Sequence, residues 1–267
     1  TLEYMRGVAR KSAALPGALV NFLTKDLNVW CNTASGWFDV QVWDRGGGKI
    51  DPASLRGRRC FGGLDLASTR DLTAFALVFP PDEPGGAWAI LVQFWCPQAK
   101  VDAQEHDDMA PYKRWATEGW ITPTPGDVTD YGPVRTAVQK AMQDYDVVDI
   151  GFDRWNAQQL CNEMMEAGVP LVEVPQNTGG MYPGSKSLEE LVYGRQLRHG
   201  GNPVLRYCAM NVALLFDTNG NFRPDKKKSN LTGRIDGIVA GVMALSRCVS
   251  VDGPFDLTDF LNNPIIA

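Results

Sequence analysis

The sequence lacks the features that mark membrane-spanning, secreted and zinc-binding proteins. No stretch approaches the run of about eighteen apolar residues that a transmembrane helix needs, and the N-terminus has no basic segment leading into an apolar one. The six cysteines are scattered and include no CxxC pair, which argues against a zinc site and against a dense disulfide framework. We therefore expect a cytoplasmic protein whose cysteines are buried free thiols.

Histidine is scarce as well, which disfavours the common serine and cysteine hydrolases. The chain has two histidines, His106 and His199, at distant positions, and it has no GxSxG motif. His199 stands between Arg198 and Gly200, and we expect it to be a cation at the C-terminus of a helix rather than a catalyst.

The size and charge of the chain limit its class. With 267 residues it can bury a sizeable core, as one large domain or as one domain with a substantial extension. The formal net charge of −5 is not the usual footprint of a nucleic-acid binder. However, acidic residues gathered around cations lower the net charge even when a separate basic face contacts phosphates. The candidates for such a face are Arg195, Arg198, Arg206, Lys226, Lys227 and Lys228.

The residue pattern divides the chain into a leader, a central unit and a tail. The leader, residues 1–59, is rich in tryptophan and has the character of a segment that docks on another unit. Residues 60–250 alternate between strand and helix patterns, and residues 251–267 have the pattern of a tail.

The central unit is expected to be an α/β domain. Short β-branched and aromatic runs predict strands at 60–67, 73–80, 87–96, 147–152 and 170–175, and an edge strand at 203–207. Helical spacing of apolar residues predicts helices at 131–145, 156–167, 185–200, 210–216 and 235–248. The first three strands favour an antiparallel meander, and the later ones a strand–helix–strand unit. We therefore expect a mixed sheet, an antiparallel meander plus parallel strands, flanked by helices.

Asp65 interrupts the end of the apolar run that begins at Cys60. A carboxylate in a buried strand is unfavourable by several kcal/mol unless it is paired or bound to a metal, so Asp65 needs a partner or a function. The alternative is that Asp65 and Asp71 are turn residues that cap the hairpin backbone. We interpret Asp65 as a metal ligand, and Asp71 as a turn residue with at most a supporting role.

Two further aspartates occupy equivalent junctions, Asp153 after a predicted strand and Asp236 at the start of the last predicted helix. If the two strands pair in parallel, Asp65 and Asp153 emerge at the same edge of the sheet, and the last helix brings Asp236 to the same point. Three such carboxylates suit Mg²⁺ or Mn²⁺, and two ions about 4 Å apart can hydrolyse a phosphodiester. The alternative is that Asp153 caps a helix and Asp236 interacts with a helix dipole.

The segments around these aspartates resemble a known family. The nuclease motifs of the large subunit of tailed-phage terminases are similar to GGLDLASTRDLTAFALVF, IGFDRWNAQQL and KKKSNLTGRIDGIVAGVMAL. The join between ATPase and nuclease in that family is similar to NVWCNTASGWFDVQVW. The resemblance covers about residues 20–250 and implies a ribonuclease H-like fold.

The resemblance implies an endonuclease that cuts concatemeric viral double-stranded DNA during genome packaging, in the cytoplasm of an infected bacterial host. It implies two Mg²⁺ or Mn²⁺ ions held by Asp65, Asp153 and Asp236, with Asp65 bridging them. It also implies the terminase small subunit and the portal as partners. The basic cluster at 226–228 is expected to hold DNA phosphates, or else to be a solvated charge run.

The ATPase part of that family is not recognisable in this sequence. GGGKI at 46–50 is not a P-loop, because Ile50 replaces the magnesium-binding hydroxyl and Trp43 replaces the first glycine. We expect the chain to be a nuclease fragment, although the ATPase could be a separate chain. The rival interpretations are a ribonuclease H-like resolvase or transposase and a non-catalytic docking module of the packaging motor.

Overall fold

The structure is a computed structural model that describes residues 37–66, 71–83, 85–103, 110–153, 158–227, 229 and 233–253. His106 and Lys228, and residues 1–36 and 254–267 of the predicted leader and tail, lie outside the described residues.

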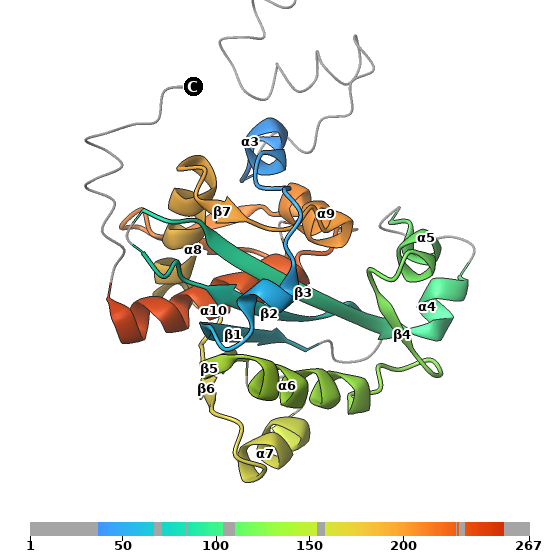
Figure 1. The fold of residues 1–267 in the computed structure, drawn as a ribbon. Helices are drawn as coiled ribbons and strands as arrows, with labels where there is room; N and C mark the ends of the chain where they lie inside the picture. The colour runs from blue at the N-terminus through green and yellow to red at the C-terminus, as the bar shows by residue number, and fades with distance from the viewer. Residues whose placement is uncertain are drawn as a thin grey trace, which may run out of the picture.

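A mixed seven-stranded sheet forms the centre of the molecule, in the order β4-β3-β2-β1-β5-β6, with β7 paired to β3 (Figure 1). Antiparallel pairing joins β1 to β2 and β2 to β3, whereas β5 runs parallel to β1 and β6 parallel to β5. The strands are β1 (Arg59–Asp65), β2 (Thr73–Phe79), β3 (Trp88–Pro97), β4 (Thr122–Thr124), β5 (Asp146–Phe152), β6 (Leu171–Glu173) and β7 (Leu197–Arg198). The predicted meander and the predicted parallel strands are therefore confirmed.

Helices cover both faces of this sheet, and each face has its own apolar cluster (Figure 1). On one face lie α8 (Thr178–Tyr193), α9 (Pro203–Asn211) and α10 (Asp236–Asp252). On the other face lie α6 (Gly132–Asp144) and α7 (Gln158–Glu166). The remaining elements are α3 (Val40–Asp44), η2 (Pro52–Leu55), α4 (Gln98–Asp102), α5 (Tyr112–Thr117) and a hairpin of β8 (Leu214–Phe216) and β9 (Phe222–Pro224).

The helix α10 lies close against the central strand β1 because β1 carries glycine at the point of contact. A Cβ atom on Gly63 would overlap the backbone carbonyl of Ala240 in α10. Strand glycines of this kind mark the close approach of another backbone. Gly63 thus fixes the distance between the sheet and the helix that begins at Asp236.

The sequence prediction was wrong where local capping outweighs β propensity. Residues 203–207 form the start of α9 rather than an edge strand, because Asn202 accepts hydrogen bonds from the backbone N–H groups of Val204 and Leu205. Pro203 occupies the first turn, where proline is favoured. The predicted helix at 210–216 is the end of α9 followed by β8.

The helix predicted at 185–200 begins earlier and ends earlier than expected. It is α8, which ends at Tyr193, and Leu197 pairs with Trp88 of β3 instead of continuing the helix. The predicted helices at 131–145 and 235–248 are confirmed as α6 and α10. Within the described ranges, no helix has both the length and the apolar character needed to cross a membrane. The five cysteines that the structure describes are buried and free, as predicted.

The described part of the leader packs into the core beside α8. Trp37 donates a hydrogen bond to Glu189 at 3.0 Å, and the Trp43 ring stacks on the His199 ring at 4.5 Å between centroids. His199 is buried and follows β7, and its Nε2 donates to the Trp43 carbonyl at 2.8 Å. The prediction of a position at the C-terminus of a helix was wrong, because His199 follows a strand, and burial lowers the pKa of its ring. The predicted boundary between leader and central unit stays a prediction.

Candidate metal centre

Asp65 and Asp153 stand at the ends of two neighbouring parallel strands. Leu64 of β1 pairs with Phe152 of β5, so the next residue of each strand emerges at the same edge of the sheet. Asp65 is the last residue of β1 and is 2% exposed. The prediction that Asp65 and Asp153 emerge at the same edge required this parallel pairing of the two strands.

Asp236 reaches the same edge from α10. It is the first residue of the helix, it is 6% exposed, and the contact of α10 with Gly63 brings it over the end of β1. A negative charge in the first turn of a helix interacts favourably with the helix dipole, as the alternative interpretation expects. The packing of α10, rather than any local signal, places Asp236 beside Asp65.

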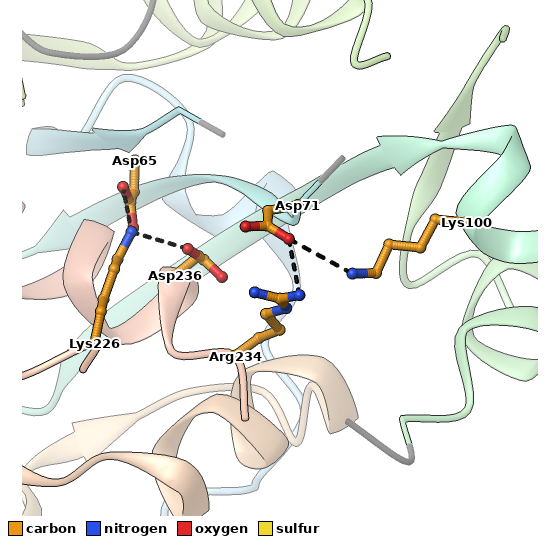
Figure 2. Close-up of polar contacts among 6 residues, drawn as sticks. All are labelled: Asp65, Asp71, Lys100, Lys226, Arg234 and Asp236. Carbon is orange, nitrogen blue, oxygen red and sulfur yellow. Dashed lines mark hydrogen bonds and ion pairs between the residues drawn. The ribbon is translucent and has the colours of Figure 1, made fainter. Parts of the chain in front are cut away.

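A lysine ammonium lies between these two carboxylates. Lys226, in the turn after β9, donates from Nζ to both carboxylate oxygens of Asp65, at 3.0 and 2.7 Å, and to Oδ1 of Asp236 at 3.0 Å. Figure 2 shows the Lys226 ammonium pointing at both aspartates. Sequence reasoning had assigned Lys226 only to a DNA-binding cluster, because Lys226 stands 161 positions after Asp65 and nothing in the sequence signalled that the two would meet.

Burial and charge act in opposite directions on this group. The pKa of Asp65 is raised to about 7, mainly by burial and also by the charges of Asp236 and Asp153, against the lowering effect of Lys226. Burial lowers the pKa of Lys226, but the two carboxylates outweigh burial and the net shift is upward. The second oxygen of Asp236, Oδ2, is buried and has no hydrogen-bond partner. An uncompensated buried carboxylate oxygen is costly unless a cation satisfies it.

The donor set fits a divalent cation, although the described residues do not already form a complete cage. Among them, no group of three histidine, cysteine, aspartate or glutamate side chains is arranged to hold a metal ion. Two aspartates nevertheless converge on one cation, and the unsatisfied Oδ2 of Asp236 offers a further ligand atom. Carboxylate oxygens are the ligands that Mg²⁺ and Mn²⁺ prefer. The roles of Asp65, Asp153 and Asp236 as metal ligands stay predictions.

Asp71 belongs to a second charged group beside this site (Figure 2). It lies just before β2, and its Oδ1 is 2.8 Å from Nη2 of Arg234 and 3.8 Å from Nζ of Lys100. Arg234 precedes Asp236 by two residues. Asp71 therefore contacts the segment that leads into α10, which is a route by which it can support the site without touching a metal.

A groove next to the carboxylates carries Lys226 and Lys227, two of the three lysines that sequence reasoning assigned to DNA. Its lining residues are Gln176, Met181, Leu215, Arg223, Pro224, Asp225, Lys226, Lys227 and Val239. Lys226 both lines the groove and contacts Asp65, so the groove leads to the site. Arg206, by contrast, forms a paired contact with Asp44 at 2.6 and 3.0 Å, away from this groove. Arg223 is the groove cation that the sequence analysis missed, because it stands apart from the lysine cluster.

The comparisons with known proteins agree with this architecture. The sequence matches the family described as "Terminase large subunit, endonuclease domain" over residues 1–251. The terminase large subunit of Enterobacteria phage HK97 is 34% identical over 263 residues, which are 96% of this chain and 50% of that protein. The crystal structure of the HK97 large terminase matches with a TM-score of 0.71 and 32% identity, over 92% of this chain and 50% of that chain.

A more distant solved structure shares the fold. The large terminase nuclease from thermophilic phage G20c with bound cobalt matches with a TM-score of 0.50 and 13% identity, over 80% of this chain and 97% of that one. The predicted ribonuclease H-like fold class is confirmed by these terminase neighbours. The chain spans about half the length of the HK97 protein that it matches.

Proposed function

The chain belongs to the endonuclease-domain family of terminase large subunits, and we propose that it is a metal-dependent DNA endonuclease that cuts concatemeric viral DNA during genome packaging. The observation that carries this proposal is that Asp65 and Asp236 converge on the ammonium of Lys226. They do so beside the end of β5, which Asp153 follows.

Asp65, Asp153 and Asp236 are the metal ligands in this proposal. Two divalent ions, Mg²⁺ or Mn²⁺, about 4 Å apart would activate a water and stabilise the leaving oxygen of the phosphodiester. Asp65 would contribute to both ions, because it shares a strand edge with Asp153 and a common lysine partner with Asp236. The G20c nuclease, which has the same fold, was crystallised with bound cobalt, which supports a requirement for a divalent metal in this proposal.

The DNA backbone lies along the basic groove in this proposal. Arg223 and Lys227 line the groove that begins at the carboxylates, and cations so placed neutralise phosphates without reading base sequence. The role of Lys228 in DNA binding rests on the sequence alone. Asp71 acts indirectly, by holding Arg234 and thus the entry to α10.

The biological setting follows from the family. Double-stranded DNA is the substrate, the terminase small subunit and the portal are the partners, and the cytoplasm of an infected bacterium is the location. The proposal concerns the nuclease activity alone, and the chain spans about half the length of the HK97 protein that it matches.

The test is cleavage of supercoiled and linear plasmid DNA in a titration of Mg²⁺ and Mn²⁺. Cleavage should require the metal, stop with chelator, and be lost in Asp65→Ala and Asp236→Ala. Asp82→Asn is the matched control, because Asp82 is an exposed aspartate that pairs with Arg58 just before β1, at the opposite end of the β1–β2 pair from Asp65.

Two outcomes would count against the proposal. If Asp65→Ala and Asp236→Ala cut as fast as the wild type, the site is wrong. A preference for branched DNA, or strand transfer instead of hydrolysis, would favour a ribonuclease H-like resolvase or transposase.

A further inference from the structure

The ammonium of Lys226 is fully engaged by the carboxylates of the site. An ammonium has three N–H donors and no acceptor. The three contacts of Lys226 Nζ, at 2.7, 3.0 and 3.0 Å, all go to oxygens of Asp65 and Asp236. In this arrangement no donor remains for a DNA phosphate, so the contact serves the carboxylates rather than the substrate.

The same oxygens are the ones that a divalent cation needs. A Mg²⁺ ion binds carboxylate oxygens at about 2.1 Å, so it would lie in the same space between Asp65 and Asp236. Two positive charges cannot share that space, because the repulsion between them is strong at short range in a poorly solvated site. Metal and ammonium therefore exclude each other.

Lys226 is placed to leave this position without unfolding. Its side chain is 42% exposed, whereas those of Asp65 and Asp236 are 2% and 9% exposed. It extends from the turn after β9 into the rim of the groove. A long flexible side chain of this kind can move its charged end outward into solvent.

We infer that Lys226 is an internal cation that competes with the catalytic divalent metal for Asp65 and Asp236 and lowers the affinity of the site for that metal. This inference rests on the proposed function. In the absence of metal the lysine compensates the two buried carboxylates and keeps the site assembled but inactive. Binding of the metal replaces that contact and releases the ammonium toward the groove.

The test measures metal binding without DNA. Mn²⁺ is titrated into the wild type, Lys226→Met and Lys227→Met by calorimetry, at a pH above the pKa of Asp65. Lys227 is the matched control because it is the next residue, lines the same groove and receives the same substitution. Lys226→Met should bind Mn²⁺ about tenfold or more tighter than the wild type, a typical size for a competitive coupling of this kind. Lys227→Met should bind as the wild type does.

Thermal unfolding gives an independent readout. In chelator, Lys226→Met should melt below the wild type, because two buried carboxylates lose their counter-ion. Saturating Mn²⁺ should raise its melting temperature more than that of the wild type. If Lys226→Met does not fold in chelator, Lys226→Gln keeps a donor without the charge and carries the same prediction, and Lys226→Arg keeps the charge and should retain affinity near that of the wild type.

The outcomes separate this inference from the proposed function. Equal or weaker Mn²⁺ binding in Lys226→Met and Lys226→Gln would overturn the inference, while metal-dependent cleavage by the wild type would leave the proposed function standing. If neither the wild type nor any variant binds Mn²⁺ or cuts DNA, the proposed function itself is overturned.

Discussion

Asp65 and Asp149 are both buried aspartates on central strands, and each is paired with a cation from another element. Asp149 of β5 is held by Arg247 of α10 through contacts of 3.2, 3.1 and 2.8 Å that engage both carboxylate oxygens. Asp65 of β1 is held by Lys226, which comes from a turn and shares its ammonium with Asp236. Arg247 thus donates to Asp149 alone, whereas Lys226 donates to two carboxylates, those of Asp65 and Asp236.

The difference lies in how replaceable the partner is. Arginine has a planar fork that fits one carboxylate, and Arg247 sits on a packed helix, so its contact with Asp149 is a fixed structural pair. Lysine is a compact charge on a flexible stem, and the pairing at Asp65 leaves Oδ2 of Asp236 unsatisfied. A buried acid becomes a candidate for metal chemistry when its partner can leave and its neighbours are not satisfied.

The largest expected effect distinguishes two acids of the same segment, Asp153 and Asp149. Asp153→Asn should reduce metal-dependent plasmid cleavage by more than about 100-fold, because even groups that only support a metal ligand contribute about 10- to 100-fold. Asp149→Asn should leave the cleavage rate per folded molecule within a few-fold of the wild type. Similar losses of cleavage in the two variants would mean that the position of Asp153 at the strand end does not distinguish a catalytic aspartate from a structural one.

The stability of the fold should depend on the ion pair between Asp149 and Arg247. Arg247→Met should lower the free energy of unfolding by about 3 kcal/mol, because Asp149 is left as an unpaired buried charge. Urea denaturation measures this change. The double variant Asp149→Leu, Arg247→Met should recover most of the loss, and a double variant as unstable as Arg247→Met would argue against an unpaired charge as the cause.

Basic side chains that line the groove should contribute to DNA binding, whereas a lysine that is ion-paired on a helix should not. Lys227→Ala and Arg223→Ala should each weaken binding of double-stranded DNA several-fold and reduce the slope of log affinity against log salt by about one. Lys186→Ala is the control, since Lys186 is on α8 and pairs with Glu190 at 3.7 Å. Filter binding over a range of salt concentrations tests this, and an unchanged slope in the groove variants would remove them from the DNA path.

The last expected effect concerns pH. Burial raises the pKa of Asp65 from its ordinary value of 3.8 to about 7, so the folded protein binds a proton that the unfolded chain releases. In chelator, this carboxyl group stabilises the fold most below pH 3.8, and its contribution is lost as the pH rises through about 7. The difference in unfolding free energy between wild type and Asp65→Asn should therefore vary with pH in this window. A difference that does not depend on pH would contradict the raised pKa of Asp65.

Local patterns in the sequence predicted a large part of the fold and the identity of the acids. Short β-branched, aromatic and apolar runs identified β1, β2, β3 and β5, because a strand buried on both faces needs apolar residues along its length. A carboxylate at the end of such a run was a visible anomaly, which is why Asp65 was found. Prediction failed at α9, where Asn202 and Pro203 start a helix in a stretch with β-like residues.

The sequence by itself determined which residue types stand at the strand and helix junctions, since that depends on neighbours along the chain. Only the tertiary structure decided that Lys226, not solvent, meets Asp65 and Asp236, and that Arg247 meets Asp149. Those meetings depend on the glycine contact between β1 and α10 and on the turn after β9. The physical reason is that side-chain pairing across 98 or 161 residues is set by packing distances, which local propensity does not encode.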